Sequence, residues 1–189
     1  MNLEAEEEIL IDVNELAKDY DYYQVSGISI SPDNKKMAFG VDTLSRRIYT
    51  IKVKDLGTGK MYPDKIHGVN SYTTWASDSK TMFYTGKDEQ TLRSDKIFRH
   101  TLGESQDDDT LVYEEKDETF STYVYPSKSR EYIMIGSTST MATEYRFLSS
   151  KTPLDSFKVI QKRERGLEYS PSHVGDMFYI STNIDESTN

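Results

Sequence analysis

The sequence predicts an all-β fold made of β-propeller blades, each with four antiparallel strands, on three observations. A unit of tight turn plus apolar strand occurs four times, at steps of 45, 50 and 45 residues counted from Met37, Met82, Tyr132 and Met177. Repeats of this length with about four short strands each are typical of propeller blades. Residues 48–56 alternate between polar and apolar, and the 14 Tyr and 7 Phe residues favour strands with one half-exposed face.

The first copy of the repeat, residues 31–59, shows how each unit is built. Residues 31–34 read Ser-Pro-Asp-Asn, in which the proline presets φ and the Asp and Asn side chains bond back to the backbone. A short apolar strand follows at 37–41, and the alternation at 48–56 predicts a half-buried strand. The glycines of 57–59 predict the next tight turn, because glycine takes a positive φ at little cost.

The same signals divide the whole chain into blades. We expect a frayed end at 1–8, the end of a preceding blade at 9–23, blades at 24–66, 69–115 and 119–160, and the start of a further blade at 167–189. Within the first remnant, 9–12 is expected to be an outer strand and 14–20 a helical turn. The remaining strands are expected near 24–30, 36–42, 48–55, 60–66, 71–76, 80–86, 95–101, 110–115, 119–125, 130–137, 143–148, 157–160, 167–171 and 176–181.

This division gives about three complete blades and two partial ones. The chain begins late in one blade and ends midway through another, so we expect an excised internal part of a larger propeller. Blade faces rich in Tyr, Phe, Ile, Val and Met require a neighbouring blade to cover them. Open faces and unpaired edges at both ends therefore predict self-association of the isolated chain.

Several segments resemble the prolyl oligopeptidase family, in particular its oligopeptidase B, or protease II, branch. They are residues 11–17, 39–50, 112–120, 129–133, 143–146 and 163–170, in order along nearly the whole chain. The resemblance implies an internal fragment of a seven-bladed N-terminal propeller that covers an α/β-hydrolase domain carrying Ser, Asp and His. It implies a serine endopeptidase that hydrolyses short peptides after Arg or Lys, with the propeller gating their access. The partners implied are that missing catalytic domain and short peptide substrates.

The chain itself carries no recognisable catalytic centre. A hydrolase of that fold needs a Gly-x-Ser-x-Gly turn, and the nearest candidates, 26–27 and 136–137, lack the second glycine. The three histidines lie on different expected blades without metal-ligand spacing, so His67, His100 and His173 are interpreted as surface or turn residues. We expect no catalytic residue, no metal and no cofactor in this chain.

Acidic turn residues are interpreted in the same way. Asp107, Asp108 and Asp109 form a charge run that predicts a solvated turn. Pro63 and Asp64 are expected to form the last turn of the first complete blade.

Arginines and one glutamate are the candidate interface residues. They are Arg46, Arg47, Glu144, Arg146, Arg163 and Arg165. One interpretation is structural, with arginine paired to glutamate across neighbouring blades to fix their angle. The other is functional, with some of these residues lining the face toward the catalytic domain or the substrate channel.

Composition limits the partners. The formal net charge of −9 argues against nucleic acid and against an anionic membrane surface. The absence of cysteine excludes disulfides and is compatible with a reducing compartment. We expect a cytoplasmic protein, with the bacterial periplasm as the alternative.

Two other functions remain open at the level of sequence. A stand-alone propeller-like protein-binding module would need closed repeats with matched ends. An enzyme with its own carboxylate site would need polar residues converging on strand ends. The sequence shows neither feature, so the propeller part of a peptidase is the favoured hypothesis.

Overall fold

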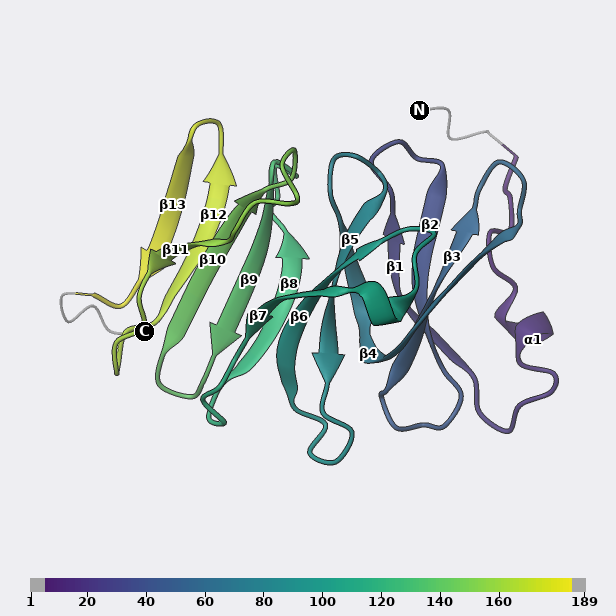
Figure 1. Cartoon of the computed structure of the whole chain (residues 1–189), viewed down its shortest axis with the longest axis horizontal. Coiled ribbons are helices and arrows are strands. Elements are labelled where there is room, and N and C mark those ends of the chain that lie inside the picture. Colours follow the sequence, from purple (N-terminus) through teal and green to yellow (C-terminus); the bar gives the residue numbers. More distant parts are fainter. Residues whose placement is uncertain (1–5, 185–189) are drawn as a thin grey trace.

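A computed structural model describes residues 6–184 and shows strands side by side in successive antiparallel sheets (Figure 1). The elements in chain order are α1 (Val13–Leu16), β1 (Gln24–Ile30), β2 (Lys36–Asp42), β3 (Tyr49–Asp55), β4 (Met61–Trp75), β5 (Thr81–Lys87), β6 (Ser94–Thr101), the 3₁₀ helix η1 (Gln106–Asp108), β7 (Thr110–Glu114), β8 (Ser121–Pro126), β9 (Tyr132–Thr138), β10 (Thr143–Ser149), β11 (Lys158–Gln161), β12 (Tyr169–Val174) and β13 (Met177–Thr182). The predicted all-β class with antiparallel four-stranded blades is confirmed.

The first two blades share one long strand. β4 pairs with β3 over its first half, where Ile51 opposes Ile66, and with β5 over its second half, where Trp75 opposes Met82. The sequence predicted two strands here, near 60–66 and 71–76, and that division is wrong. Gly68, with φ of 73°, lies where the strand passes from one blade to the next. The sequence has only this glycine here and lacks a longer turn motif. The chain therefore changes its pairing strand, from β3 to β5, without leaving the sheet.

The third blade is a separate sheet in the order β11-β10-β9-β8, and β12 with β13 begins the next. The alternation predicted for the third strand of the first blade is confirmed in β3, because Tyr49, Ile51 and Val53 are buried while Thr50 and Lys52 are half-buried.

The N-terminal segment differs from the prediction. Residues 9–12 form no strand, and Ile9 is 76% exposed. A strand needs a hydrogen-bonded partner, and among residues 6–184 none pairs with this segment. The helical turn is also shorter than the predicted 14–20: Asp12 caps it by accepting from the backbone N–H groups of Asn14 and Glu15. Residues 1–5 of the predicted frayed end lie outside the described residues, as do residues 185–189 of the last predicted blade.

Apolar side chains fill the seams between blades. The first seam, between the first and second blades, contains buried side chains of β2 to β5, including Ile51, Ile66 and Trp75. The second seam, between the second and third blades, contains Phe83, Ile97, Ile135 and neighbouring residues. Each blade thus buries its apolar faces against the next blade rather than within itself.

Two glycines allow the first seam to close at its inner strands. A Cβ on Gly27 would lie 2.0 Å from the backbone oxygen of Ser71, and one on Gly40 would lie 2.7 Å from the Ser71 Cα. Both distances are far below a normal contact, so any side chain at either position would force the blades apart. Gly27 also has φ of 67°, at an irregularity in the pairing of β1 with β2.

Candidate functional site

The predicted charged residues lie at one edge of the blades. Arg46 and Arg47 lie between β2 and β3, and Glu144 lies near the start of β10. Both hairpins turn at the lower edge in Figure 1. Arg163 and Arg165 follow β11, which runs antiparallel to β10 and therefore ends at the same edge. The antiparallel order of the strands thus brings residues that are far apart in the sequence to one edge of the blades.

Arg163 joins the second blade to the third. Its Nη2 lies 2.6 Å from Oε2 of Glu115, which follows β7, and its Nη1 lies 3.2 Å from the other oxygen of that carboxylate. Nη2 also lies 3.2 Å from Oε1 of Glu144 on β10. The guanidinium stacks over the Phe120 ring at 4.0 Å. A two-point contact of this kind fixes orientation as well as charge.

A second arginine completes this cluster. Arg146 lies 2.5 Å from Oε1 of Glu144 and stacks over the Tyr113 ring at 4.2 Å. The Tyr113 hydroxyl donates to Glu115 at 2.6 Å and accepts from Ser137 at 3.1 Å. We call these residues the Arg163 cluster: Tyr113, Glu115, Phe120, Ser137, Glu144, Arg146 and Arg163.

The cluster keeps its charges despite burial. Burial opposes ionisation of Glu115, but hydrogen bonds from Arg163 and Tyr113 outweigh it and lower the pKa of Glu115 to about 2. The pKa of Glu144 is also lowered, because the backbone N–H of Arg163 and the charge of Arg146 outweigh burial. Glu115 and Arg163 therefore stay charged from mildly acidic to alkaline pH.

The other three candidates are placed differently. Arg46, Arg47 and Arg165 are exposed, and no carboxylate in residues 6–184 lies within ion-pair distance of them. The backbone around Arg47 is nevertheless well fixed. The buried Asp42 accepts from the N–H groups of Leu44 and Arg47, and Lys87 of the second blade donates to the Arg47 carbonyl at 2.9 Å. The structure thus brings Glu144, Arg146 and Arg163 together and leaves these three arginines facing outward.

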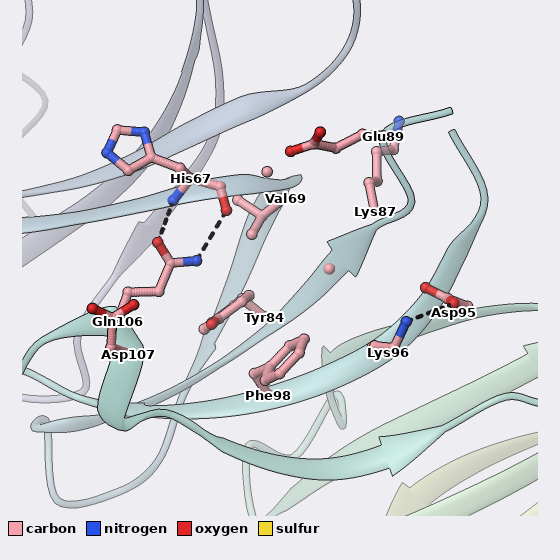
Figure 2. Close-up of a pocket in the computed structure, with 12 residues that line it drawn as sticks. His67, Val69, Tyr84, Lys87, Glu89, Asp95, Lys96, Phe98, Gln106 and Asp107 are labelled. Atoms are coloured by element: carbon pink, nitrogen blue, oxygen red, sulfur yellow. Dashed lines mark hydrogen bonds and ion pairs between the residues drawn. The ribbon is translucent and has the colours of Figure 1, made fainter. Parts of the chain in front are cut away.

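A hollow of about 450 Å³ lies beside this edge, on the second blade (Figure 2). Tyr84 and Phe98 line it with rings stacked at a centroid distance of 5.4 Å. Gln106 of η1 closes one side, since its amide accepts from the His67 N–H at 2.9 Å and donates to the His67 carbonyl at 3.0 Å. Lys96 pairs with Asp95 on the other side.

Sequence reasoning missed a buried polar network behind this hollow. His100 is 1% exposed, and its ring lies between the carboxylates of Asp64 and Asp109. Three interpretations are corrected here: His100 is not a surface residue, Asp64 belongs to β4 rather than to a turn, and Asp109 is not solvated. The sequence did contain a signal that Asp64 is buried, because Asp64 lies on the same strand face as Ile66, two residues later.

The other two histidines differ in burial, so the interpretation as surface or turn residues holds for one of them and not for the other. His67 is exposed, as predicted, whereas His173 is buried and lies against the rings of Tyr132 and Phe178. His173 also contacts the Ser129 hydroxyl at 2.8 Å. No described carboxylate orients this pair, which therefore lacks the third member of a catalytic triad.

No group of three or more His, Asp or Glu side chains in residues 6–184 is arranged to hold a metal ion. His100 faces two carboxylates and no hydroxyl nucleophile, so it has no group to activate. Within the same range, no helix is both long and apolar enough to span a membrane.

The strand order and the seams define a partial β-propeller. Over residues 1–189 the chain matches the model of the prolyl oligopeptidase N-terminal β-propeller domain, and it belongs to that family. It is 40% identical over 185 residues to dipeptidyl aminopeptidase BI of Pseudoxanthomonas mexicana, and 32% identical over 182 residues to Protease 2 of Moraxella lacunata. These alignments cover 98% and 95% of the chain, but only 25% and 26% of the relatives.

Solved structures agree. Oligopeptidase B from Leishmania major matches 94% of the chain with a TM-score of 0.89 and 31% identity, and oligopeptidase B from Trypanosoma brucei matches 95% with a TM-score of 0.86 and 26% identity. The chain covers 25% of each of those proteins. The predicted resemblance to the oligopeptidase B branch is confirmed, and the chain corresponds to about a quarter of such a peptidase.

The Arg163 cluster yields a stability prediction. Replacing Arg163 by Ala leaves two buried carboxylates without their shared cation, and we expect a loss of about 3–5 kcal/mol in the free energy of unfolding. Arg163→Lys should recover only part of this, because an ammonium cannot make the two-point contact. Arg165→Ala is the matched control and should change stability by no more than about 0.5 kcal/mol. Urea denaturation at neutral pH measures all three, and equal effects of Arg163→Ala and Arg165→Ala would show that the cluster does not hold the seam.

Proposed function

We propose that this chain is the non-catalytic propeller part of an oligopeptidase B-like serine peptidase, and that it restricts which peptides reach an α/β-hydrolase domain of the same parent protein. The observation that carries the proposal is the match to oligopeptidase B over 94% of the chain but 25% of that protein. Further support comes from residues 6–184, which contain blades packed closely against one another and no catalytic constellation. A wall of such blades excludes substrates by size without taking part in the chemistry.

The substrate class has two candidates. The resemblance to oligopeptidase B favours an endopeptidase that cleaves short peptides after Arg or Lys. The 40% identical relative is named dipeptidyl aminopeptidase BI, which favours release of dipeptides from a free amino terminus. We propose the endopeptidase and retain the second activity as the competing candidate.

The parent protein distinguishes these activities. We expect it to hydrolyse amino-blocked chromogenic peptides that end in Arg or Lys, and to be labelled by a serine-directed probe. Dipeptide substrates with a free amino terminus should react more slowly, and a preference for them would favour the competing candidate. The isolated chain should hydrolyse neither substrate. If its turnover scales with the purified chain, the non-catalytic role is wrong.

We further propose that Arg46 and Arg47 face the catalytic domain or the substrate path. Support comes from their exposure and from the lack of a described carboxylate partner, although Asp42 and Lys87 hold their backbone firmly. Ser45 and Arg47 both have φ of 56°, a region that costs free energy for residues other than glycine. Strain of this kind is concentrated at functional sites.

A matched pair of variants tests this role in the parent protein. Arg47→Ala, alone or with Arg46→Ala, should lower kcat/KM about tenfold, the effect of losing one charged contact. Arg130→Ala is the control, because Arg130 is also exposed with φ of 61° but lies at the opposite edge, between β8 and β9. Equal kcat/KM values for the Arg47 and Arg130 variants would rule out the interface role.

The isolated chain is also proposed to self-associate. Its last two strands expose Val174, Met177 and Tyr179, each more than half accessible to solvent. In the parent these faces would be covered by further blades. Light scattering over a dilution series should show assemblies of the isolated chain that dissociate on dilution. A monodisperse monomer at high concentration would contradict this proposal.

A further inference from the structure

The buried histidine behind the hollow is held by two carboxylates at once. Nδ1 of His100 lies 2.6 Å from Oδ1 of Asp109, and Nε2 lies 3.0 Å from Oδ1 of Asp64. The side chains of His100 and Asp64 are 1% exposed and that of Asp109 is 3% exposed. Water therefore does not mediate these contacts, and the three groups must satisfy one another.

The geometry fixes the protonation of the ring. A neutral imidazole has one N–H donor, whereas an ionised carboxylate only accepts. Both contacts are satisfied together when both ring nitrogens carry a proton, that is, when His100 is an imidazolium. Burial by itself lowers the pKa of His100, but the hydrogen bonds to Asp109 and Asp64 outweigh it, and the pKa is raised.

The two carboxylates are themselves held by other parts of the chain. Asp64 Oδ1 also accepts from the backbone N–H of Gly103 at 2.5 Å, and Asp109 Oδ2 accepts from the Tyr84 hydroxyl at 2.7 Å. The second oxygen of Asp64 is buried without a described partner, so this carboxylate depends on His100 and Gly103 for its compensation. Removal of the ring proton would place a lone pair against one of these carboxylates.

The network lies where three elements meet. Asp64 belongs to the half of β4 that pairs with β3, His100 lies on β6, and Asp109 follows η1. The residues between β6 and β7, 102–109, are thus fastened to β4 directly through Gly103, and indirectly through Asp109, whose carboxylate contacts His100 on β6. The same connection carries Gln106, which closes the hollow of Figure 2 against His67.

We propose that the His100 imidazolium is a pH-sensitive latch that holds the connection 102–109 against β4 and so closes one side of the hollow. The titratable groups that face it are Asp64 on β4, Asp109 after η1 and, through Asp109, Tyr84 on β5. The β5 residue paired directly with His100 is the apolar Met82. Loss of the ring proton releases the connection, and Gln106 moves away from His67. This device is independent of the peptidase assignment.

The direction of the pH effect follows from linkage. The raised pKa means that the latched state binds the proton more tightly than the released state, whose ring has an ordinary pKa of about 6.5. The latch is at full strength below that pH. Above it, release becomes about tenfold more favourable per pH unit, until the pH exceeds the pKa of the latched state. At higher pH the dependence levels off.

Hydrogen exchange in the full-length parent protein measures the release. The readout is the exchange of peptides covering 102–109, corrected for intrinsic base catalysis, at a series of pH values from 6 to 10. In the wild type the corrected opening should rise by about tenfold per pH unit above pH ~6.5 and then level off. Peptides from β9 in the third blade serve as an internal reference and should not follow this profile.

Three variants decide whether His100 is the titrating group. Asp64→Asn keeps an acceptor for Gly103 and offers a donor to a neutral ring, which lowers the pKa of His100 in the latched state, so the rise should level off at lower pH. His100→Gln should abolish the rise. If His100→Gln fails to fold, the profile of Asp64→Asn decides whether His100 is the titrating group. His67→Gln, at the exposed histidine of the same hollow, should keep the wild-type profile. A rise that levels off at the wild-type pH in Asp64→Asn, a persistent rise in His100→Gln, or its loss in His67→Gln would each overturn the latch.

Discussion

The packing of one blade against the next is the constraint on which this structure depends. A four-stranded blade has two faces and no layer of its own to cover either of them, so its apolar side chains are buried only across a seam. The approach at the first seam is so close that Gly27 and Gly40 leave no room for a Cβ beside Ser71. Every other feature, including the position of the charged edge, follows from how these seams are set.

Each of the two seams joins an apolar layer with a buried ionic cluster, and the clusters differ in chemistry. The second seam uses guanidinium groups, which stay protonated at any pH a protein meets. The first seam uses an imidazolium, which loses its proton much closer to neutrality. The seams therefore respond differently to pH. The Arg163 cluster weakens in acid, because below the ordinary glutamate pKa the unfolded chain takes up a proton that folded Glu115 binds only near pH 2. The His100 network weakens in the opposite direction, as the pH rises and the ring loses its proton.

Burying charges in this way is not an efficient source of stability. Desolvation of an ion pair offsets most of its Coulomb attraction, and an apolar cluster of similar volume often does as well. What the two-point contact of Arg163 supplies is direction, since one guanidinium meets Glu115 of the second blade and Glu144 of the third in fixed positions. Apolar layers permit sliding, and a directional contact at the edge of the layer sets the angle between blades.

The sequence predicted strand positions well because alternation and turn residues are local signals. Every strand of the complete blades except β4 was expected within a few residues, and the alternation in β3 identified its buried face. The long β4 was missed because a change of pairing partner leaves no local mark beyond Gly68. The Arg163 cluster was partly predicted, whereas Glu115 lay unremarked at the end of a strand. The roles of Asp64, His100 and Asp109 depend on contacts over 36 and 9 residues, which a single sequence does not reveal.

These seams also limit any opening of the propeller in the proposed gating role. Separating the second blade from the third would leave the buried Glu115 without Arg163, at a cost of about 3–5 kcal/mol before any apolar area is counted. Separating the first from the second would break the His100 network as well. The hairpin that carries Arg46 and Arg47 lies outside both clusters, and among residues 6–184 the bond from Lys87 to the Arg47 carbonyl is the only hydrogen bond between it and the next blade. In the proposed gating role, motion at the edge hairpins would therefore cost least in this part of the propeller, and Arg46 and Arg47 lie on one of these hairpins without a described carboxylate partner.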